Sequence, residues 1–333
     1  MRVMIRMAIG ILVAMRALQA SADPPPPIIV LCGPTASGKS SLSIDLAQLS
    51  DGVVINADSM QVYRELRIVT ARPDAAAESA APHALYGVTP AVERCSAGRW
   101  RDMAIQAIAD ARADGRRPIL VGGSGLYLSA LLDGLSAIPA PGPAATAEGE
   151  AALARLGVQG LHADLAAIDP EAAAALAPND RQRILRAWIV KRATGRSIVA
   201  WRRGSPTPPW PEPALIVALD PPRPALRATI AARAASMAAS GALDEAAAFL
   251  AVDTHHASPA AKAVGLRAFA AAAAGETSLD TAIAQVAVET AQYAKRQTTW
   301  FRKRPAPTIR ISEQLSESLR RSIARKILTE RLT

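Results

Sequence analysis

A short segment near the start of the chain has the composition of a phosphate-binding loop, or P-loop. It reads G-x-x-x-x-G-K-S and consists of Gly33, Pro34, Thr35, Ala36, Ser37, Gly38, Lys39 and Ser40. The glycines let backbone N–H groups converge on phosphate oxygens, while the N-terminus of the following helix and the Lys39 ammonium add positive charge. The Ser40 hydroxyl is a suitable ligand for Mg²⁺. The segment therefore predicts a phosphate site with Mg²⁺ as cofactor, without specifying the phosphate compound.

Asp58 is the next residue whose position indicates chemistry. It follows the apolar run 53–55, and a carboxylate there can accept a proton beside the ligand of the P-loop. A P-loop NTPase ordinarily holds Mg²⁺ with an acidic residue after a later strand, but here that strand ends in Val121, Gly122 and Gly123. Asp58 could also cap a helix or lie in the outer shell of the metal. The residues by themselves leave these roles open.

The order of apolar runs indicates which elements position these residues. Buried strands are predicted at 28–32, 53–55, 118–121 and 215–219. Helices are predicted from Ser40 onward, over 99–113 and over 126–132. Alternating strands and helices form a parallel sheet whose ligands bind beyond the carboxyl ends of the strands. We therefore expect an α/β fold, a P-loop NTPase-like parallel sheet flanked by helices, in which loops 33–40, 58–61 and 122–125 meet at one edge.

Proline-rich stretches divide the chain into segments. We expect an N-terminal extension at 1–27, a catalytic core at 28–137 and 214–302, a helical insertion domain at 138–213, and a basic tail at 303–333 that frays. In the extension, an apolar run precedes Ala20-Ser21-Ala22, which resembles a signal-peptidase site. The run is shorter than the ~20 residues of a membrane-spanning helix. We interpret the extension as a non-native start, with Met15 among the later initiators, and expect no membrane partner.

The bulk composition favours a folded protein with a polyanionic partner. Half of the 333 residues are hydrophobic and 20% are charged, which allows a large core and argues against wholesale disorder. The net charge of +9 suits nucleic acid, although it is also compatible with solubility alone. Cys32 and Cys95 lack metal-ligand or disulfide spacing, which fits a reducing, cytoplasmic location. His255 and His256 have no partner of ligand spacing, so we expect no metal there.

The segment 181–196 is the best candidate for an RNA-binding helix. At helical spacing its two faces hold Gln182, Arg183 and Arg186 on one side and Ile184, Leu185, Trp188 and Ile189 on the other. A basic face on a packed helix suits the phosphates of RNA. The same pattern is also typical of a helix whose basic face is only exposed to solvent.

Beyond the P-loop, further blocks resemble the bacterial tRNA dimethylallyltransferase family and follow the family's order. They are 58–63 (DSMQVY), 70–73 (TARP), 81–83 (APH), 120–127 (LVGGSGLY), 178–183 (PNDRQR) and 294–301 (AKRQTTWF). Together with the strand and P-loop that precede them, they extend over residues 28 to about 302. This number of blocks makes the resemblance specific.

The resemblance implies transfer of a dimethylallyl group from dimethylallyl diphosphate to the exocyclic amine of the adenosine 3′ of the anticodon in tRNA. The P-loop would hold the diphosphate, and Lys39 and Mg²⁺ would stabilise its departure. Asp58 would accept the amine proton. Ser124 stands where the family usually has threonine, and its hydroxyl would contact the reacting region. The adenosine must be flipped into a pocket.

The resemblance also implies contacts with the tRNA anticodon stem-loop, which we expect a monomer to bind. The residues are Asp58, Ser59, Met60, Gln61, Thr146, Gln182, Arg183, Ile184, Leu185, Arg186, Lys295 and Arg296, with Gln297 near them.

Besides Ser124, three further positions depart from the family pattern. Thr229 stands where the family usually has an arginine that helps to bind diphosphate, and Arg227 and Arg233 are the candidates to replace it. Leu266 stands at a common tyrosine position and Ala291 at a usual arginine position. These departures bear on individual site residues more than on the activity.

Other activities share some of these features. A small-molecule P-loop kinase would use residues 33–40 to bind ATP, and a non-catalytic RNA-binding protein could retain a P-loop as a relic. An adenylate isopentenyltransferase would act on free AMP. Lys39, Ser40 and Asp58 together favour catalysis, and the basic helix favours a macromolecular acceptor. The sequence therefore predicts a tRNA prenyltransferase.

Overall fold

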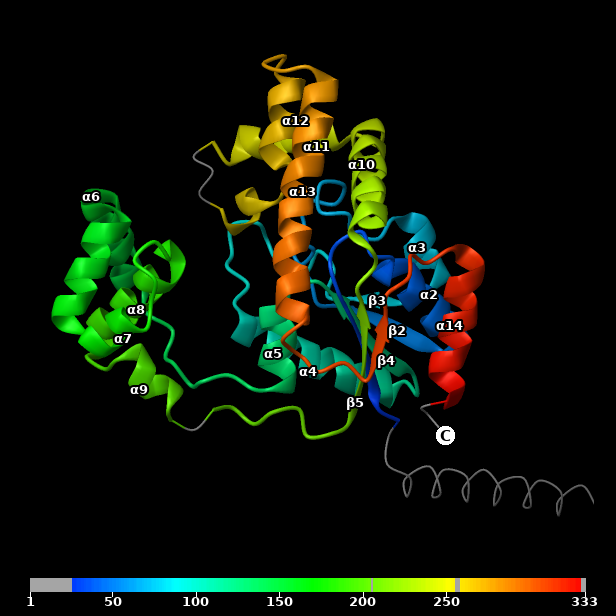
Figure 1. Ribbon diagram of the computed structural model, residues 1–333, viewed down its shortest axis with the longest axis horizontal. Coiled ribbons are helices and arrows are strands. Elements are labelled where there is room, and N and C mark those ends of the chain that lie inside the picture. Colours follow the sequence, from blue (N-terminus) through cyan, green and yellow to red (C-terminus); the bar gives the residue numbers. More distant parts are fainter. Residues whose placement is uncertain (1–25, 205, 255–257, 331–333) are drawn as a thin grey trace, which may run out of the picture. The chain divides into compact units, whose positions relative to one another are not determined.

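The computed structural model describes residues 26–204, 206–254 and 258–330. Two predictions concern residues outside these ranges: the signal-like N-terminal segment and the pair His255-His256. The chain forms two compact units, which are described separately (Figure 1). Unit 1 contains the residues up to Leu128 and from Glu212 onward, and unit 2 spans residues 129–211.

Unit 1 is built on a six-stranded sheet in which every pairing is parallel. The strands are β1 (Ile28–Cys32), β2 (Gly52–Asn56), β3 (His83–Ala84), β4 (Arg117–Gly122), β5 (Ala214–Leu219) and β6 (Ile309–Ile311). Their order across the sheet is β3-β2-β4-β1-β5-β6, so the strand that leads into the P-loop lies between β4 and β5. All five residues of β1 are buried because helices cover both faces of the sheet. The predicted α/β fold is confirmed.

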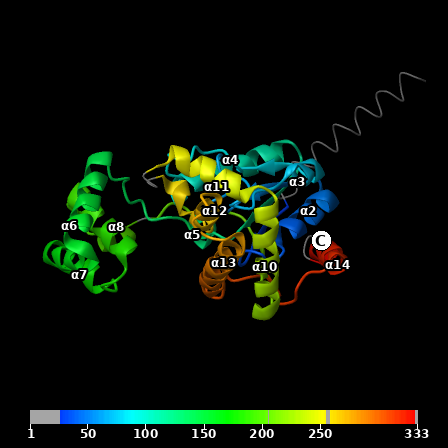
Figure 2. The same cartoon turned by 90° about the horizontal axis from the view of Figure 1, so that it is seen from above.

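The helices of unit 1 follow the strands as crossover connections and as a separate layer. They are α2 (Lys39–Ser50), α3 (Ala75–Ala80), α4 (Ala97–Ala113), α5 (Gly125–Leu132, which extends into unit 2), α10 (Arg223–Ala239), α11 (Ala242–Val252), the 3₁₀ turn η1 (Pro259–Lys262), α12 (Leu266–Ala273), α13 (Leu279–Phe301) and α14 (Glu317–Glu330). The helices α10 and α13 pack side by side (Figure 1, Figure 2). Among the described residues no single helix is long and apolar enough to cross a bilayer, and only α10 with α11, bent by 70°, meets those criteria as a pair.

The segment after residue 302 differs from the fraying tail that the sequence predicted. β6 pairs in parallel with β5, and α14 packs against α2. Ile311, Ala324 and Ile327 are buried in the same core cluster as the strands. The side chain of Arg320 on α14 also forms an ion pair with the buried Asp45 of α2. The prediction was wrong because it weighed the basic charge of this segment and overlooked its apolar residues at helical spacing.

Unit 2 is a small helical body with its own core. It contains α6 (Pro143–Ile168), α7 (Pro170–Ala174), α8 (Arg181–Thr194) and α9 (Ile198–Arg202). α6 is interrupted at Gly157, whose φ of 67° is a left-handed value that glycine adopts without strain. Trp188 of α8 packs in the core and donates a hydrogen bond from Nε1 to Asp164 at 2.6 Å. The core of unit 2 is therefore built mainly between α6 and α8.

Candidate active site

The P-loop connects β1 to α2 through a backbone that requires glycine. Gly33 has a φ of 142°, and a Cβ atom there would collide with the carbonyl oxygen of Leu219 on the neighbouring strand. Gly38 has a φ of 91° and precedes the first residue of α2. Lys39 follows, is only 9% exposed, and donates from Nζ to the carbonyl oxygen of Pro34 at 2.6 Å. The ammonium is therefore folded back over the loop that would hold a phosphate.

Burial makes the Lys39 ammonium costly when no anion is bound. The pKa of Lys39 is lowered to about 8, mainly by desolvation and also by the nearby Arg233 guanidinium, while the Asp58 carboxylate opposes the shift. An anion in the loop would reverse this effect because it favours the charged form. The electrostatics of the loop are therefore those of an anion site.

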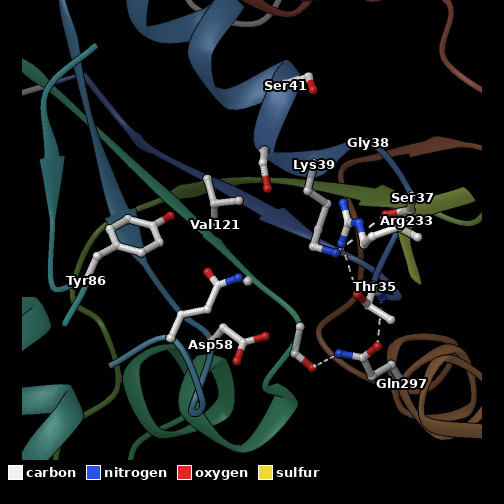
Figure 3. A pocket seen from close by; sticks show the side chains of 15 residues that line it. Thr35, Ser37, Gly38, Lys39, Ser41, Asp58, Tyr86, Val121, Arg233 and Gln297 are labelled. Carbon is white, nitrogen blue, oxygen red and sulfur yellow. Dashed lines mark hydrogen bonds between the residues drawn. The ribbon is translucent and has the colours of Figure 1, made fainter. Parts of the chain in front are cut away.

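Two cavities open beside the P-loop, and both lie within unit 1. The P-loop cavity, of about 60 Å³, is lined by residues 35–41 with Asp58, Gln61, Tyr86 and Arg233, among others (Figure 3). The adjoining cavity, of about 250 Å³, has largely apolar walls from α10, α13 and the segment 69–71. Thr35, Asp58, Gln61 and Arg233 line both cavities. These residues therefore stand between the phosphate cradle and a larger pocket.

Asp58 is held at the carboxyl end of β2 by a local hydrogen-bond network. The buried side chain of Asn56 accepts the backbone N–H of Asp58 at 2.8 Å, and Asp58 Oδ1 accepts the N–H of Met60 at 2.9 Å. Burial raises the pKa of Asp58, and the Met60 N–H and the Lys39 ammonium oppose that rise. The carboxylate is consequently a better proton acceptor than an exposed aspartate.

The loop after β4 lies directly against the Asp58 loop. The Ala57 N–H donates to Val121 at 2.8 Å, and a Cβ atom on Gly122 would collide with the carbonyl oxygen of Ala57. Ser124 Oγ accepts the N–H of Ser59 at 2.8 Å and donates to Ser59 Oγ at 3.0 Å. The structure thus brings together the loops at 58–61 and 122–125, with the Ser124 hydroxyl beside the residue that follows Asp58.

Gln297, which the resemblance placed near the tRNA contacts, lies buried beside the P-loop. It comes from α13, is 4% exposed, and accepts the backbone N–H of Thr35 on Oε1 at 2.8 Å (Figure 3). Its Nε2 donates to the carbonyl oxygen of Gly123 at 2.9 Å. One side chain therefore joins the P-loop to the loop that carries Ser124. Because Gln297 is far from Thr35 and Gly123 in the sequence, no local sequence pattern could predict these two hydrogen bonds.

Arg233 is the arginine that the structure brings to the P-loop. It lies on α10, donates from Nη1 to Thr35 Oγ1 at 3.4 Å, and lines both cavities. Within the described ranges no carboxylate is in ion-pair distance of it, and burial lowers its pKa. Arg227 is exposed and lines neither cavity. The Thr229 hydroxyl donates to the carbonyl oxygen of Ala225 on its own helix. Of the two candidate arginines, Arg233 is therefore the one that lies at the P-loop.

The remaining sequence candidates fall into two groups. In unit 1, Ser59, Met60, Gln61 and Arg296 line the adjoining cavity, and Lys295 is exposed on α13. In unit 2, the side chains assigned to RNA are in different environments. Gln182 and Arg183 are exposed, Leu185, Arg186 and Thr146 are half-buried, and Ile184 is fully buried.

The prediction that the Ile184 side chain contacts RNA was wrong. It is 0% exposed in the core that α6 and α8 form, where it contributes to folding of unit 2. The helical pattern had already put it on the apolar face. Its assignment to the RNA contacts came from the family resemblance alone.

The fold and the site define a P-loop protein with a mixed polar and apolar pocket beside its phosphate cradle. No group of three or more His, Cys, Asp or Glu side chains in the described part of the chain is arranged to hold a metal. The sequence profile of the IPP transferase family matches residues 61–304. The chain belongs to this family, and the resemblance seen in its motifs is confirmed.

Relatives and solved structures agree with the family assignment. The chain is 50% identical over 297 residues to the tRNA dimethylallyltransferase of Rhodospirillum rubrum, covering 88% of this chain and 91% of the relative. It is 47% identical over 311 residues to that of Paramagnetospirillum magneticum, covering 92% and 98%.

Among solved structures, the full-length tRNA isopentenylpyrophosphate transferase of Bacillus halodurans matches with a TM-score of 0.63 and 31% identity, covering 92% of this chain and 97% of that one. A eukaryotic dimethylallyltransferase acting on tRNA matches with a TM-score of 0.68 and 26% identity, covering 83% and 70%. Both solved structures extend over the greater part of the present chain.

Proposed function

We propose that the protein transfers a dimethylallyl group from dimethylallyl diphosphate to the exocyclic amine of the adenosine immediately 3′ of the anticodon in tRNA. The observation that carries the proposal is the position of Asp58, which lines both the P-loop cavity and the adjoining cavity. A proton acceptor between a phosphate cradle and a second pocket is what an alkyl transfer between two substrates requires. The curated relatives named as tRNA dimethylallyltransferases support this activity.

In this mechanism the P-loop holds the diphosphate of the donor. As the C–O bond of the allylic carbon breaks, negative charge grows on the departing diphosphate. Lys39, Arg233 and the loop amides stabilise that charge. The Thr35 N–H is already bonded to Gln297, so the donors are the later amides of the loop. Water exclusion by the buried loop strengthens these interactions.

The acceptor side of the mechanism uses Asp58. The adenosine amine forms a bond to the allylic carbon, the diphosphate leaves with the electrons of the C–O bond, and the amine proton passes to the Asp58 carboxylate. Its raised pKa favours acceptance of that proton. The Ser124 hydroxyl, fixed to Ser59, lies where it can orient the reacting groups.

Mg²⁺ is the cofactor that these residues fit. The Ser40 hydroxyl lies in the first turn of α2 and makes no hydrogen bond with the described residues, so it is available as an oxygen ligand. Asp58 lines the same cavity, and its carboxylate would help to attract the ion. When bound, Mg²⁺ would neutralise part of the diphosphate charge.

The adjoining cavity is our candidate for the flipped adenosine and the hydrocarbon of the donor. Its apolar walls, which include Ile230, Met237 and Val286, suit an unstacked base or a prenyl chain. Lys262 and Arg296 line the same cavity and would bind RNA phosphates. We further propose that unit 2, through Gln182, Arg183 and Arg186, contacts the anticodon stem-loop, and that the enzyme acts as a monomer.

The proposal is tested by analysing nucleosides after incubation of the purified protein with dimethylallyl diphosphate, Mg²⁺ and unmodified tRNA. The expected product is an adenosine alkylated on its exocyclic amine, with release of pyrophosphate and no requirement for ATP. Modification of free AMP but not of tRNA would instead identify an adenylate isopentenyltransferase. Consumption of ATP in the presence of a small acceptor would identify a kinase.

A further inference from the structure

Tyr86 is a residue of the P-loop cavity for which the mechanism so far has no role. It follows the edge strand β3, and its ring packs edge-on against His83 with centroids 5.4 Å apart. The ring also contacts the core cluster that contains Leu42 and Val54. The residue as a whole is half-buried and lines the P-loop cavity. The ring is therefore anchored by packing while its polar end belongs to the site.

The Tyr86 hydroxyl makes no hydrogen bond with the part of the protein that the structure describes. By contrast, the Tyr127 hydroxyl, which lines neither cavity, donates to the carbonyl oxygen of Cys95 at 3.0 Å. The Tyr86 oxygen is not among the fully buried side-chain polar atoms that lack a partner, so it is accessible from the P-loop cavity that the residue lines. The Tyr86 hydroxyl is therefore open to a hydrogen-bonding ligand in that cavity.

The surroundings of Tyr86 determine which kind of partner this is. Burial and the nearby Asp58 carboxylate raise the pKa of Tyr86, so the phenol stays protonated and is available as a hydrogen-bond donor. The cavity it lines is also lined by Lys39 and Arg233, and Figure 3 shows Tyr86 and Arg233 on opposite sides of it. A neutral donor facing two cations across one cavity is suited to an anion placed between them.

We propose that the Tyr86 hydroxyl donates a hydrogen bond to a diphosphate oxygen of the donor substrate and of the released pyrophosphate. Tyr86 is then a binding residue from the edge of the sheet that complements the P-loop and Arg233. The inference rests on the proposed function, because it requires a diphosphate in the P-loop cavity. It adds a contact from a loop, residues 85–88, that the P-loop motif does not include.

The test is calorimetric titration of the protein with inorganic pyrophosphate in the presence of Mg²⁺. Tyr86→Phe removes an oxygen that bonds to nothing in the described protein, so the variant should fold and keep its melting temperature. Its affinity for pyrophosphate should fall about tenfold, the scale of a lost hydrogen bond to a charged group. Tyr127→Phe is the matched control and should bind pyrophosphate within about twofold of the unsubstituted protein, since its hydroxyl is bonded outside the cavity.

The outcomes separate this inference from the proposed function. If the unsubstituted protein does not bind pyrophosphate, the diphosphate site itself is wrong and both ideas fail. If it binds and Tyr86→Phe binds equally well, the role of Tyr86 is refuted while the diphosphate site stands. If Tyr86→Phe loses melting temperature together with affinity, the hydroxyl is structural and the inference is again refuted.

Discussion

Gln297 accepts the backbone N–H of Thr35 at 2.8 Å, so a helix near the end of the chain holds one of the first amides of the P-loop. The other end of the same side chain donates to Gly123, next to Ser124. The donor cradle and the loop beside the acceptor are therefore held by one buried amide. We therefore predict that the two hydrogen bonds of Gln297 position the reacting groups.

Gln297→Met keeps the length of the side chain and removes both hydrogen bonds. Because two buried backbone groups lose their partner, kcat/KM should fall by about 10- to 100-fold, with a higher KM for the donor. Steady-state kinetics measure this effect. Gln292→Met, at an exposed position of the same helix, is the control and should leave kinetics unchanged. Full activity in Gln297→Met would show that the P-loop holds its shape without α13.

Arg233 and Arg227 allow a matched comparison on α10. Arg233→Ala removes a half-buried cation that lines both cavities, and we expect pyrophosphate affinity to fall by at least about tenfold. Arg227→Ala changes an exposed side chain of the same type and should have little effect. Titration calorimetry of both variants with pyrophosphate measures the two affinities. Equal losses would mean that the positive charge acts at long range and that Arg233 has no specific contact.

The lowered pKa of Lys39 predicts a dependence of donor binding on pH. Below a pH of about 8 the side chain is charged and attracts the diphosphate, and above it the charge is lost. The ratio of pyrophosphate affinities between the unsubstituted protein and Lys39→Ala should therefore fall as the pH rises through that value. The ratio corrects for ionisation of pyrophosphate itself. A ratio that stays constant across this range would show that Lys39 remains charged throughout.

Four of the six described strands, β1, β2, β4 and β5, and the P-loop could be predicted from the sequence because their signals are local. Each apolar run is contiguous, and the glycines of the P-loop are needed by the backbone at the same positions. Asp58 was identified for the same reason, since it directly follows a strand end. These features depend on neighbours in the chain rather than on the final packing.

Gln297 and Tyr86 could not be assigned to the P-loop in this way, and the choice between Arg227 and Arg233 stayed open, because only the tertiary fold brings these side chains to the loop. Gln297 lies 262 positions from Thr35, and its burial depends on how α13 meets the sheet. The strand β6 and helix α14 were missed because a short strand and a charged amphipathic helix have weak local signals. Their apolar residues acquire a role only against β5 and α2.

The basic residues of unit 2 lead to a prediction about affinity rather than rate. Arg183→Ala combined with Arg186→Ala should weaken tRNA binding and make its salt dependence shallower by roughly one to two in the log–log slope. The rate of transfer at saturating tRNA should be nearly unchanged, because these residues lie outside both cavities. Binding curves at several salt concentrations measure the slope. Arg155→Ala, at an exposed position of α6, is the control.

If the double variant keeps its tRNA affinity and its salt slope, unit 2 does not contact RNA through this helix. A loss of rate at saturation would instead place these arginines in the reaction. The first outcome would move the RNA-binding surface elsewhere on the protein, and the second would contradict a role in affinity alone.

The central claim is that Asp58 takes the proton from the acceptor amine, and the single-turnover rate of Asp58→Asn tests it most directly. The substitution keeps the shape and one acceptor oxygen but removes the negative charge. The rate of dimethylallyl transfer to saturating tRNA should fall by ~10²–10⁴, the usual scale for loss of a general base. The dissociation constant for tRNA, measured in parallel, should change little because phosphate contacts supply most of the affinity. An unchanged rate, or a loss of tRNA affinity as large as the loss of rate, would contradict the claim and make Asp58 a positioning residue.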